Sequence, residues 1–106
     1  MGLDPVLIEE ITRRIVRTTH PDRIILFGSA ATGEMNRDSD IDLLVVGPAV
    51  PDPRQESVKI RRALRGLGYA FDIIVMATDW FEDTKNVIGG LAYPANKYGR
   101  LIYERG

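Results

Sequence analysis

Residues 28–43, GSAATGEMNRDSDIDL, are the stretch that decides how this chain is interpreted. The stretch opens with a glycine-serine pair directly after the apolar run 24–27, and it closes with two aspartates, Asp40 and Asp42. Side chains at i and i+2 of a strand point to the same side, about 6–7 Å apart along the chain. Two carboxylates so placed repel each other unless a cation lies between them. A phosphate-sized turn beside a cation site is typical of nucleotide chemistry.

Length and composition are those of an ordinary globular domain. The 106 residues, 44% hydrophobic and 27% charged, are enough for one core but not two, so we expect a single domain over 1–106. A net charge of −1 gives no global attraction to nucleic acid or membrane, and we expect direct binding to neither. The absence of cysteine excludes disulfides and thiolate sites. No bilayer-spanning run or signal peptide is recognised, so we expect a cytoplasmic protein.

Hydrophobic spacing and turn residues predict helices and strands in alternation. The first half is predicted to contain a helix from Asp4-Pro5 to His20, a strand at 24–27, a turn and loop over 28–39 and a strand at 41–46. A helix from Asp52-Pro53 to about Leu67 and a strand at 71–76 follow. The last part is predicted to contain a short helix with Trp80 and Phe81, capped by Thr78 or Asp79, then a helical segment at 91–98 and an edge strand at 101–103. Because a helix joins the second and third strands, the sheet is parallel or mixed. The predicted fold class is α/β (α+β), a small mixed sheet flanked by helices.

The glycine-serine turn is a candidate phosphate site. Gly28 ends a strand and lets backbone N–H groups approach a ligand, because no Cβ stands in the way. If a helical turn begins at Ser29, its free N–H groups favour an anion, and the hydroxyl adds a donor. The alternative is a plain strand-to-helix turn with a serine cap, and the pair alone favours that alternative.

The aspartates are a more specific signal. Ile41 should point into the core while Asp40 and Asp42 face the other side, and Asp72 also precedes an apolar strand. If the two strands are neighbours, three carboxylates converge at one end of the sheet, a donor set that suits Mg²⁺ or Mn²⁺ rather than zinc. The alternative for the first pair is an exposed strand entrance, with Asp38 and Ser39 making a turn. An EF-hand fails because Gly is missing at its sixth position and Glu at its twelfth.

These motifs together resemble the minimal nucleotidyltransferase domain of the DNA polymerase β superfamily, in the form found in antitoxins. That family has a strand followed by G-S-x-A-x-G, a loop, S-D-x-D-L and a third aspartate on a later strand. The matching positions here are Gly28, Ser29, Ala31 and Gly33, then Ser39, Asp40, Asp42 and Leu43, and finally Asp72. The resemblance covers nearly the whole chain. One departure is Thr32, where many members carry an arginine that could touch a phosphate.

The resemblance implies a metal-dependent nucleotidyltransferase. It implies that Asp40 and Asp42 hold one or two Mg²⁺ ions with the triphosphate of ATP or another NTP. It also implies that Asp72 ligates the catalytic ion and either acts as the base for the incoming hydroxyl or helps to orient that base. Gly28 and Ser29 would hold the terminal phosphates, with Gly33 and Ser39 completing the nucleotide site. Attack at the α-phosphorus would transfer NMP and release pyrophosphate.

The acceptor follows only from the resemblance. A chain of this length leaves little room for an acceptor pocket, which favours an acceptor presented by a partner. Stand-alone domains of the family resemble antitoxins whose partner is a helical HEPN-type ribonuclease toxin, neutralised by adenylylation of a tyrosine. The alternatives are an antibiotic-type nucleotidyltransferase and a binding module that inhibits its partner by contact alone.

Other polar and aromatic residues are weaker candidates. His20 is interpreted as a surface or capping residue at a helix end. The basic residues Lys59, Arg61, Arg62 and Arg65 are interpreted as a solvated helix face, with a phosphate or partner contact as the alternative. The aromatic residues Trp80, Phe81, Tyr93 and Tyr98 are interpreted as core or interface rather than a base-stacking platform.

Overall fold

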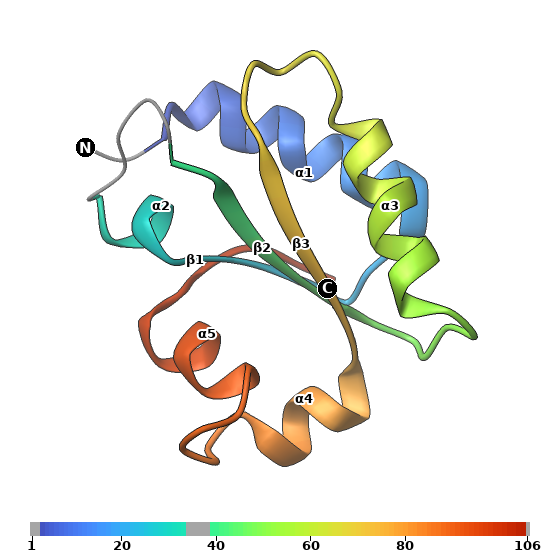
Figure 1. Ribbon diagram of the computed structural model, residues 1–106, viewed down its shortest axis with the longest axis vertical. Helices are drawn as coiled ribbons and strands as arrows, with labels where there is room; N and C mark the ends of the chain where they lie inside the picture. The colour runs from blue at the N-terminus through green and yellow to red at the C-terminus, as the bar shows by residue number, and fades with distance from the viewer. Residues whose placement is uncertain (1–2, 34–38, 106) are drawn as a thin grey trace.

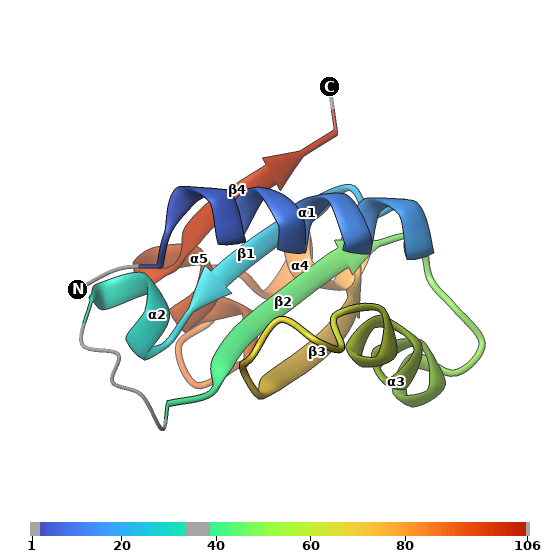
Figure 2. The ribbon, with the colours of Figure 1, turned by 90° about the horizontal axis from the view of Figure 1, so that it is seen from above.

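Four strands form one mixed sheet with helices on both of its faces (Figures 1 and 2). This computed structural model describes residues 3–33 and 39–105. The elements are α1 (Pro5–Thr19), β1 (Arg23–Phe27), α2 (Ser29–Thr32), β2 (Ile41–Gly47), α3 (Pro53–Ala63), β3 (Phe71–Ala77), α4 (Thr78–Thr84), α5 (Ala92–Tyr98) and β4 (Arg100–Glu104). The predicted fold class is confirmed. The predicted loop after the helical turn falls largely on residues 34–38, which lie outside the described residues.

The sheet has the strand order β3-β2-β1-β4. Strand β2 runs parallel to β3, as the intervening helix α3 predicted, and antiparallel to β1. Strand β4 pairs with the other side of β1 and forms an edge, so the predicted terminal edge strand is confirmed.

Each face of the sheet has its own apolar core. Helices α1 and α3 cover one face, where Ile11 and Ile15 of α1 and Ile60 of α3 are almost fully buried against the strands. Helices α4 and α5 cover part of the opposite face, where Phe81 and Ala92 pack on Leu44 and Val46 of β2. The second cluster is smaller and leaves the starts of β2 and β3 uncovered on that face.

The long helices begin where the sequence predicted. Asp4 caps α1 and Asp52 caps α3, each carboxylate accepting a hydrogen bond from the backbone two residues on, at 2.8 and 3.1 Å. His20 ends α1 in the left-handed region at φ 52° and is exposed, in keeping with its interpretation as a surface or capping residue. Helix α3 ends at Ala63, however, and the predicted end near Leu67 is wrong.

Phe81 is buried, but Trp80 and Tyr98 are 61% and 62% exposed, so they are not part of the core.

The predicted cap of α4 is also wrong. Neither Thr78 nor Asp79 caps this helix; Ala77 occupies the cap position, and no side chain bonds there. The Thr78 hydroxyl instead donates a hydrogen bond of 2.6 Å to the Asp22 carboxylate, which lies before β1. A distant partner therefore takes the side chain that local sequence assigns to the cap.

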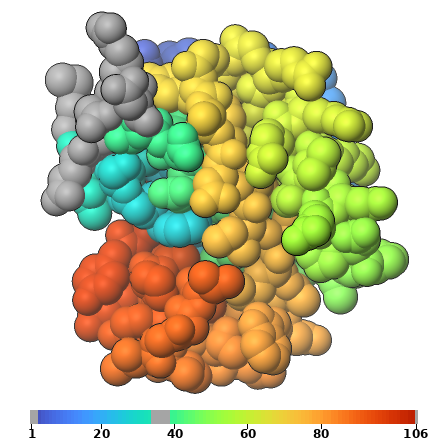
Figure 3. Space-filling model, viewed as in Figure 1, coloured from blue at the N-terminus to red at the C-terminus, as the bar shows by residue number. Residues whose placement is uncertain are grey.

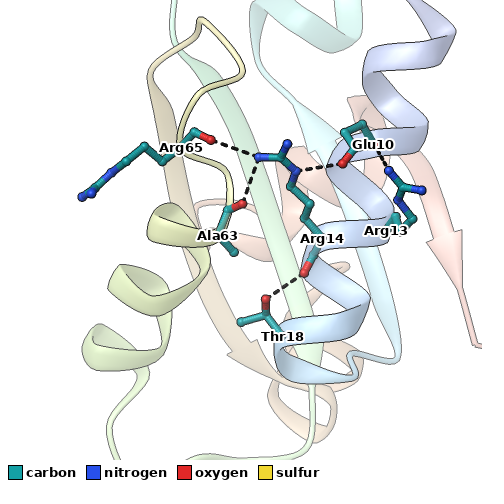
Figure 4. A network of polar contacts seen from close by, with 6 residues as sticks. All are labelled: Glu10, Arg13, Arg14, Thr18, Ala63 and Arg65. Carbon is teal, nitrogen blue, oxygen red and sulfur yellow. Dashed lines mark hydrogen bonds and ion pairs between the residues drawn. The ribbon is translucent and has the colours of Figure 1, made fainter.

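Arg14 of α1 fixes the end of α3 (Figure 4). One of its terminal nitrogens, Nη1, donates to the carbonyl oxygens of Ala63 at 3.2 Å and Arg65 at 3.0 Å, while Nε donates to Glu10 at 2.8 Å. The last carbonyls of a helix have no partner within the helix. The contact supplies that partner, and Gly66 then turns the chain at φ +92°, which explains why the helix stops before Leu67.

We expect Arg14→Met to lower the free energy of unfolding by about 1–3 kcal/mol, because charge-assisted bonds to two carbonyls are lost while the apolar stem is kept. The control is Arg13→Met, since the Arg13 side chain is 65% exposed and, among the described residues, its ion pair is with Glu10. The control should cost less than about 0.5 kcal/mol. Urea unfolding followed by circular dichroism measures both. Equal losses would show that the α3 contact contributes nothing.

In the part of the chain that the structure describes, no helix is long and apolar enough to cross a membrane.

Candidate active site

Asp42 and Asp72 lie opposite each other on neighbouring strands. In the parallel pairing of β2 with β3, Asp42 is in register with Asp72, one position after the pair Ile41 and Phe71. Paired residues of adjacent strands point to the same face, and the strands are about 4.8 Å apart. The prediction that the two strands are neighbours is confirmed, and their register brings the backbone of Asp72 opposite that of Asp42.

Asp40 and Ile41 occupy the entrance of β2. Ile41 is fully buried between the two aspartates, as its predicted inward orientation requires, whereas Asp40 is exposed. The Ile41 N–H donates to the carbonyl oxygen of Ala70 at 2.9 Å, directly before β3 begins. This bond fixes the start of β2 against the start of β3, and so holds the two acidic positions side by side.

The environment of Asp42 disfavours a charged carboxylate. Burial raises the pKa of Asp42, and the negative charges of Asp72 and Asp40 raise it further. None of these three aspartates takes part in an ion pair within residues 3–33 and 39–105. The site thus brings acidic groups together with no protein cation of the described chain beside them.

Gly28 packs directly against the carboxylate of Asp42. Strand β1 ends at Phe27, which pairs with Asp42 across the antiparallel ladder, and Gly28 follows at φ 68° and ψ −151°. A Cβ at position 28 would lie 2.3 Å from Oδ2 of Asp42. The glycine is therefore required by its backbone and by the acidic group beside it. The contact joins the glycine-serine turn and the aspartate pair into one site.

The other predicted nucleotide-binding residues surround this contact. Ser29 is the first residue of α2 and is half-buried, and the helix ends after Thr32 with Gly33 at φ 81°. Ser39 is half-buried just before Asp40. Thr32 is exposed, and its hydroxyl faces the carbonyl oxygens of its own turn, 3.3 Å from that of Ser29. The predicted helical turn after Gly28 is confirmed.

The donor set suits a hard divalent cation. Paired carboxylates without a positively charged neighbour favour Mg²⁺ or Mn²⁺, which prefer oxygen ligands. Among the described residues, however, no three acidic or histidine side chains stand close enough together to hold a metal ion as they lie. The two strands therefore bring Asp42 and Asp72 opposite each other, but the three carboxylates do not form a closed cluster as they lie.

Sequence reasoning did not foresee that Gly28 touches Asp42. The contact depends on the register of β1 against β2, which places Phe27 opposite Asp42. Neither residue type nor spacing carries that register when a loop separates the strands. The signal in the sequence is a glycine that ends one strand and an aspartate that starts the next. On sequence alone these are interpreted as two separate features.

Residues 8–90 match the family model of the nucleotidyltransferase domain. The match spans both halves of the site and all three aspartates. The chain belongs to this family. The sequence-based resemblance to a nucleotidyltransferase domain and the enzyme class, nucleotidyltransferase, are thereby confirmed.

One curated protein and several solved structures are similar to this chain. A curated relative from Methanocaldococcus jannaschii, named for protein adenylyltransferase activity, is 35% identical over 54 residues, 51% of this chain and 54% of the relative. The chain thus spans about half the length of that curated relative. A crystal structure of a mutant of the toxin-antitoxin complex MntA-HpeT is similar with a TM-score of 0.69 at 17% identity, over 92% of this chain and 73% of that one.

Two further solved structures share the fold. One is a toxin-antitoxin crystallised with AMP-PNP, with a TM-score of 0.64 and 22% identity over 92% of this chain and 73% of that one. The other is a nucleotidyltransferase from Sulfolobus solfataricus, with a TM-score of 0.60 and 21% identity over 99% of this chain and 93% of that one. At these identities the similarity establishes the shared fold.

Proposed function

We propose that this nucleotidyltransferase transfers AMP from ATP to a hydroxyl of a partner protein, as the antitoxin of a toxin-antitoxin pair. The observation that carries the chemistry is the pairing of Asp42 with Asp72 across β2 and β3, beside the close approach of Gly28. Such a site holds acidic ligands next to a turn that can admit phosphates. The partner rests on the names of the similar proteins, a protein adenylyltransferase and two toxin-antitoxin complexes.

In the proposed reaction, a hydroxyl oxygen of the acceptor attacks the α-phosphorus of ATP. The bond from that phosphorus to the oxygen bridging to the β-phosphate breaks, and pyrophosphate leaves. Asp72 is exposed at the start of β3, where it can accept the hydroxyl proton. When bound, Mg²⁺ or Mn²⁺ supplies positive charge against the phosphates and the leaving pyrophosphate. Asp40, Asp42 and Asp72 are the residues that would hold it.

The turn after β1 is proposed to hold the phosphates. Gly28 keeps the backbone accessible. The N–H groups of Ala31 and Thr32 donate to the carbonyl oxygen of Gly28, which leaves those of Ser29 and Ala30 for the phosphates. Ser29 contributes a hydroxyl, with Gly33 and Ser39 at the ends of the same loop. Thr32 in place of the family's frequent arginine removes one cation, so we expect ATP affinity to rest on the metal and the backbone.

We propose that the acceptor is a tyrosine of a helical HEPN-type ribonuclease toxin. The face of the sheet that carries Asp42 is left uncovered by α4 and α5 near the starts of β2 and β3 (Figure 3). A large acceptor such as a protein side chain needs an open approach of this kind. A small-molecule acceptor, by contrast, is usually enclosed in a pocket.

The test uses ATP labelled at the α- or at the γ-phosphate, Mg²⁺ and the purified toxin. We expect the toxin to gain label only from α-labelled ATP and to lose ribonuclease activity in proportion. Chelation of the metal should lower labelling at least about 100-fold. The matched variants are Asp40→Asn/Asp72→Asn and Asp79→Asn/Asp83→Asn, which change the charge equally, the second on the exposed surface of α4.

Each outcome decides the proposal. The α4 variant should label the toxin like the wild type, and the site variant should not. If neither the wild type nor the site variant labels the toxin and yet both inhibit it, the chain is a contact inhibitor and the transfer proposal is wrong. Label on a small aminoglycoside-like acceptor but not on protein would replace the protein acceptor and keep the reaction.

A further inference from the structure

The exposed side of α3 is strongly basic although the whole chain is nearly neutral. Between Ser57 and Phe71 the sequence has four basic residues and no acidic one, against a net charge of −1 for the chain. The basic residues of this side are Arg54, Lys59, Arg61, Arg62 and Arg65, and all are exposed. We call these five residues, with Val58 and Tyr69, the basic surface. Figure 3 shows α3 and the turn after it, yellow-green to yellow, along the right of the view.

The arginines form a stripe. Arg54 and Arg61 lie seven residues apart on α3, which places them on one side of a helix of 3.6 residues per turn, and Arg65 follows in the turn after Ala63. From Arg54 to Arg61 the stripe extends about 10 Å along α3. The buried side is opposite, where Ile60 and Leu64 are 0% and 1% exposed.

The cations of this surface are not neutralised by neighbouring acids. Within the described residues none of the five takes part in an ion pair. The two nearest acids along the chain have other partners: Asp52 caps α3, and Glu56 accepts a hydrogen bond from the Thr19 hydroxyl. The charges therefore face solvent and are open to an external anion.

Two grooves lie along the stripe and have lining residues in common. One, of about 740 Å³, runs along the first turns of α3, and the other, of about 560 Å³, runs along its end toward Tyr69. Val58 and Arg62 line both grooves, and Asp52 and Glu56 also line the first. Beyond the helix, Gly66 and Gly68 have positive φ and no atom within 4 Å of an added Cβ, so the backbone of this turn is open to a ligand.

We propose that the basic surface binds single-stranded RNA. A protein interface has an apolar core depleted of charge, whereas on this surface the large exposed apolar side chains, Val58 and Tyr69, 36% and 42% exposed, lie among five cations. Nucleic-acid interfaces are more polar and strongly positive. An aromatic side chain beside a track of cations suits a strand whose bases are free to stack. The expectation of no nucleic-acid binding came from net charge, which averages this surface with acidic residues elsewhere.

The proposed RNA surface does not depend on the proposed transfer reaction. Helix α3 packs on the face of the sheet that carries Ile41 and Ile73, whereas Asp42 and Asp72 are on the opposite face. RNA binding can therefore succeed or fail without altering the acidic site. Nucleotidyl transfer, measured in parallel on the same variants, separates the two.

The test is fluorescence anisotropy with a labelled single-stranded RNA of about 20 nucleotides, at salt from about 50 to about 200 mM. If four of the five cations each contact one phosphate, the expected slope of log K against log salt is about −2.8. Binding then weakens about 50-fold across that range. Arg61→Glu/Arg65→Glu should lower the affinity at least about 10-fold and flatten the slope by about 1.4. Tyr69→Ala should lower it at least about 5-fold.

The control is Lys97→Glu/Arg100→Glu, which makes the same change of net charge at exposed positions away from α3. This variant should bind RNA within about twofold of the wild type. Arg61→Gln/Arg65→Gln removes the two positive charges without adding negative ones. Melting curves for every variant detect a folding defect. Equal losses in the two glutamate variants, no saturable binding at low salt, or binding of an acidic protein with no binding of RNA would overturn the proposal. So would duplex DNA bound as tightly as RNA with no effect of Tyr69→Ala.

Discussion

Asp42→Asn is expected to reduce nucleotidyl transfer at least about 100-fold while leaving the protein at least as stable as the wild type at neutral pH. The loss of activity follows from the place of Asp42, opposite Asp72 and against Gly28, at the centre of the acidic site. The gain in stability follows from electrostatics. Burial, Asp72 and Asp40 all raise the pKa of Asp42, so the folded protein disfavours the charged carboxylate.

The sign of the pH dependence follows from that shift. Because the pKa of Asp42 is higher in the folded than in the unfolded protein, its contribution to stability is fully present below the unfolded pKa. That contribution is lost as the pH rises through the folded pKa. Asparagine has no proton to lose, so the stability of Asp42→Asn relative to wild type should increase from about pH 3 to about pH 7.

Thermal melting from about pH 3 to about pH 8 measures this difference. The control is Asp79→Asn, an exposed aspartate in the first turn of α4, where a negative charge favours the helix. This variant should be slightly less stable than the wild type at neutral pH. Mg²⁺ should raise the melting temperature of the wild type more than that of Asp42→Asn. A melting temperature of Asp42→Asn that falls below the wild type only at neutral pH would contradict the electrostatic account.

Local sequence chemistry predicted where the elements begin better than where they end. Asp4 and Asp52 cap α1 and α3 through hydrogen bonds to residues two positions on, so a few adjacent residues suffice. The end of α3 depends on Arg14, which reaches the carbonyls of Ala63 and Arg65 from another helix. Such a contact is not encoded near the helix end.

The aromatic residues show the same limit. Trp80 and Phe81 are adjacent and were interpreted together as core or interface, yet Phe81 is 2% exposed and Trp80 is 61% exposed. Which of two neighbours faces the sheet depends on how α4 docks, and the docking is set by the Thr78 contact with Asp22 and by the packing of Phe81 on β2. Spacing alone cannot supply that orientation.

The acidic site was predictable in part because parallel strands joined by a helix are usually neighbours. That rule brought Asp72 of β3 toward Asp40 and Asp42 of β2 before the register was known. The pairing of Phe27 with Asp42, which brings Gly28 onto the carboxylate, follows from an antiparallel register across a loop. The sequence supplied both residues but not the contact between them.

Gly28→Ala is expected to lower the free energy of unfolding by about 1–3 kcal/mol and nucleotidyl transfer at least about 10-fold. Position 28 has φ 68° and ψ −151°, a backbone conformation that is almost restricted to glycine. The added Cβ would also lie 2.3 Å from Oδ2 of Asp42, so the carboxylate must move away from the position it shares with Asp72. The loss of activity therefore follows from displacement of an acidic ligand.

Gly66→Ala separates these two causes. Gly66 also has positive φ, at +92°, but no atom lies within 4 Å of the Cβ it would acquire. The control variant should lose stability through backbone strain and keep wild-type transfer. Urea unfolding and initial rates with labelled ATP measure the two effects for each protein.

A double-mutant cycle tests the contact itself. In an Asp42→Ala background the carboxylate that opposes the new Cβ is absent, so Gly28→Ala should cost less stability there than in the wild type, by about 0.5–3 kcal/mol. The remaining cost measures the backbone strain at position 28 alone, and Gly66→Ala gives the strain at a second position of positive φ that has no such contact. If Gly28→Ala costs the same in both backgrounds, the glycine is required by its backbone alone. The turn and the aspartates would then be neighbours without being coupled.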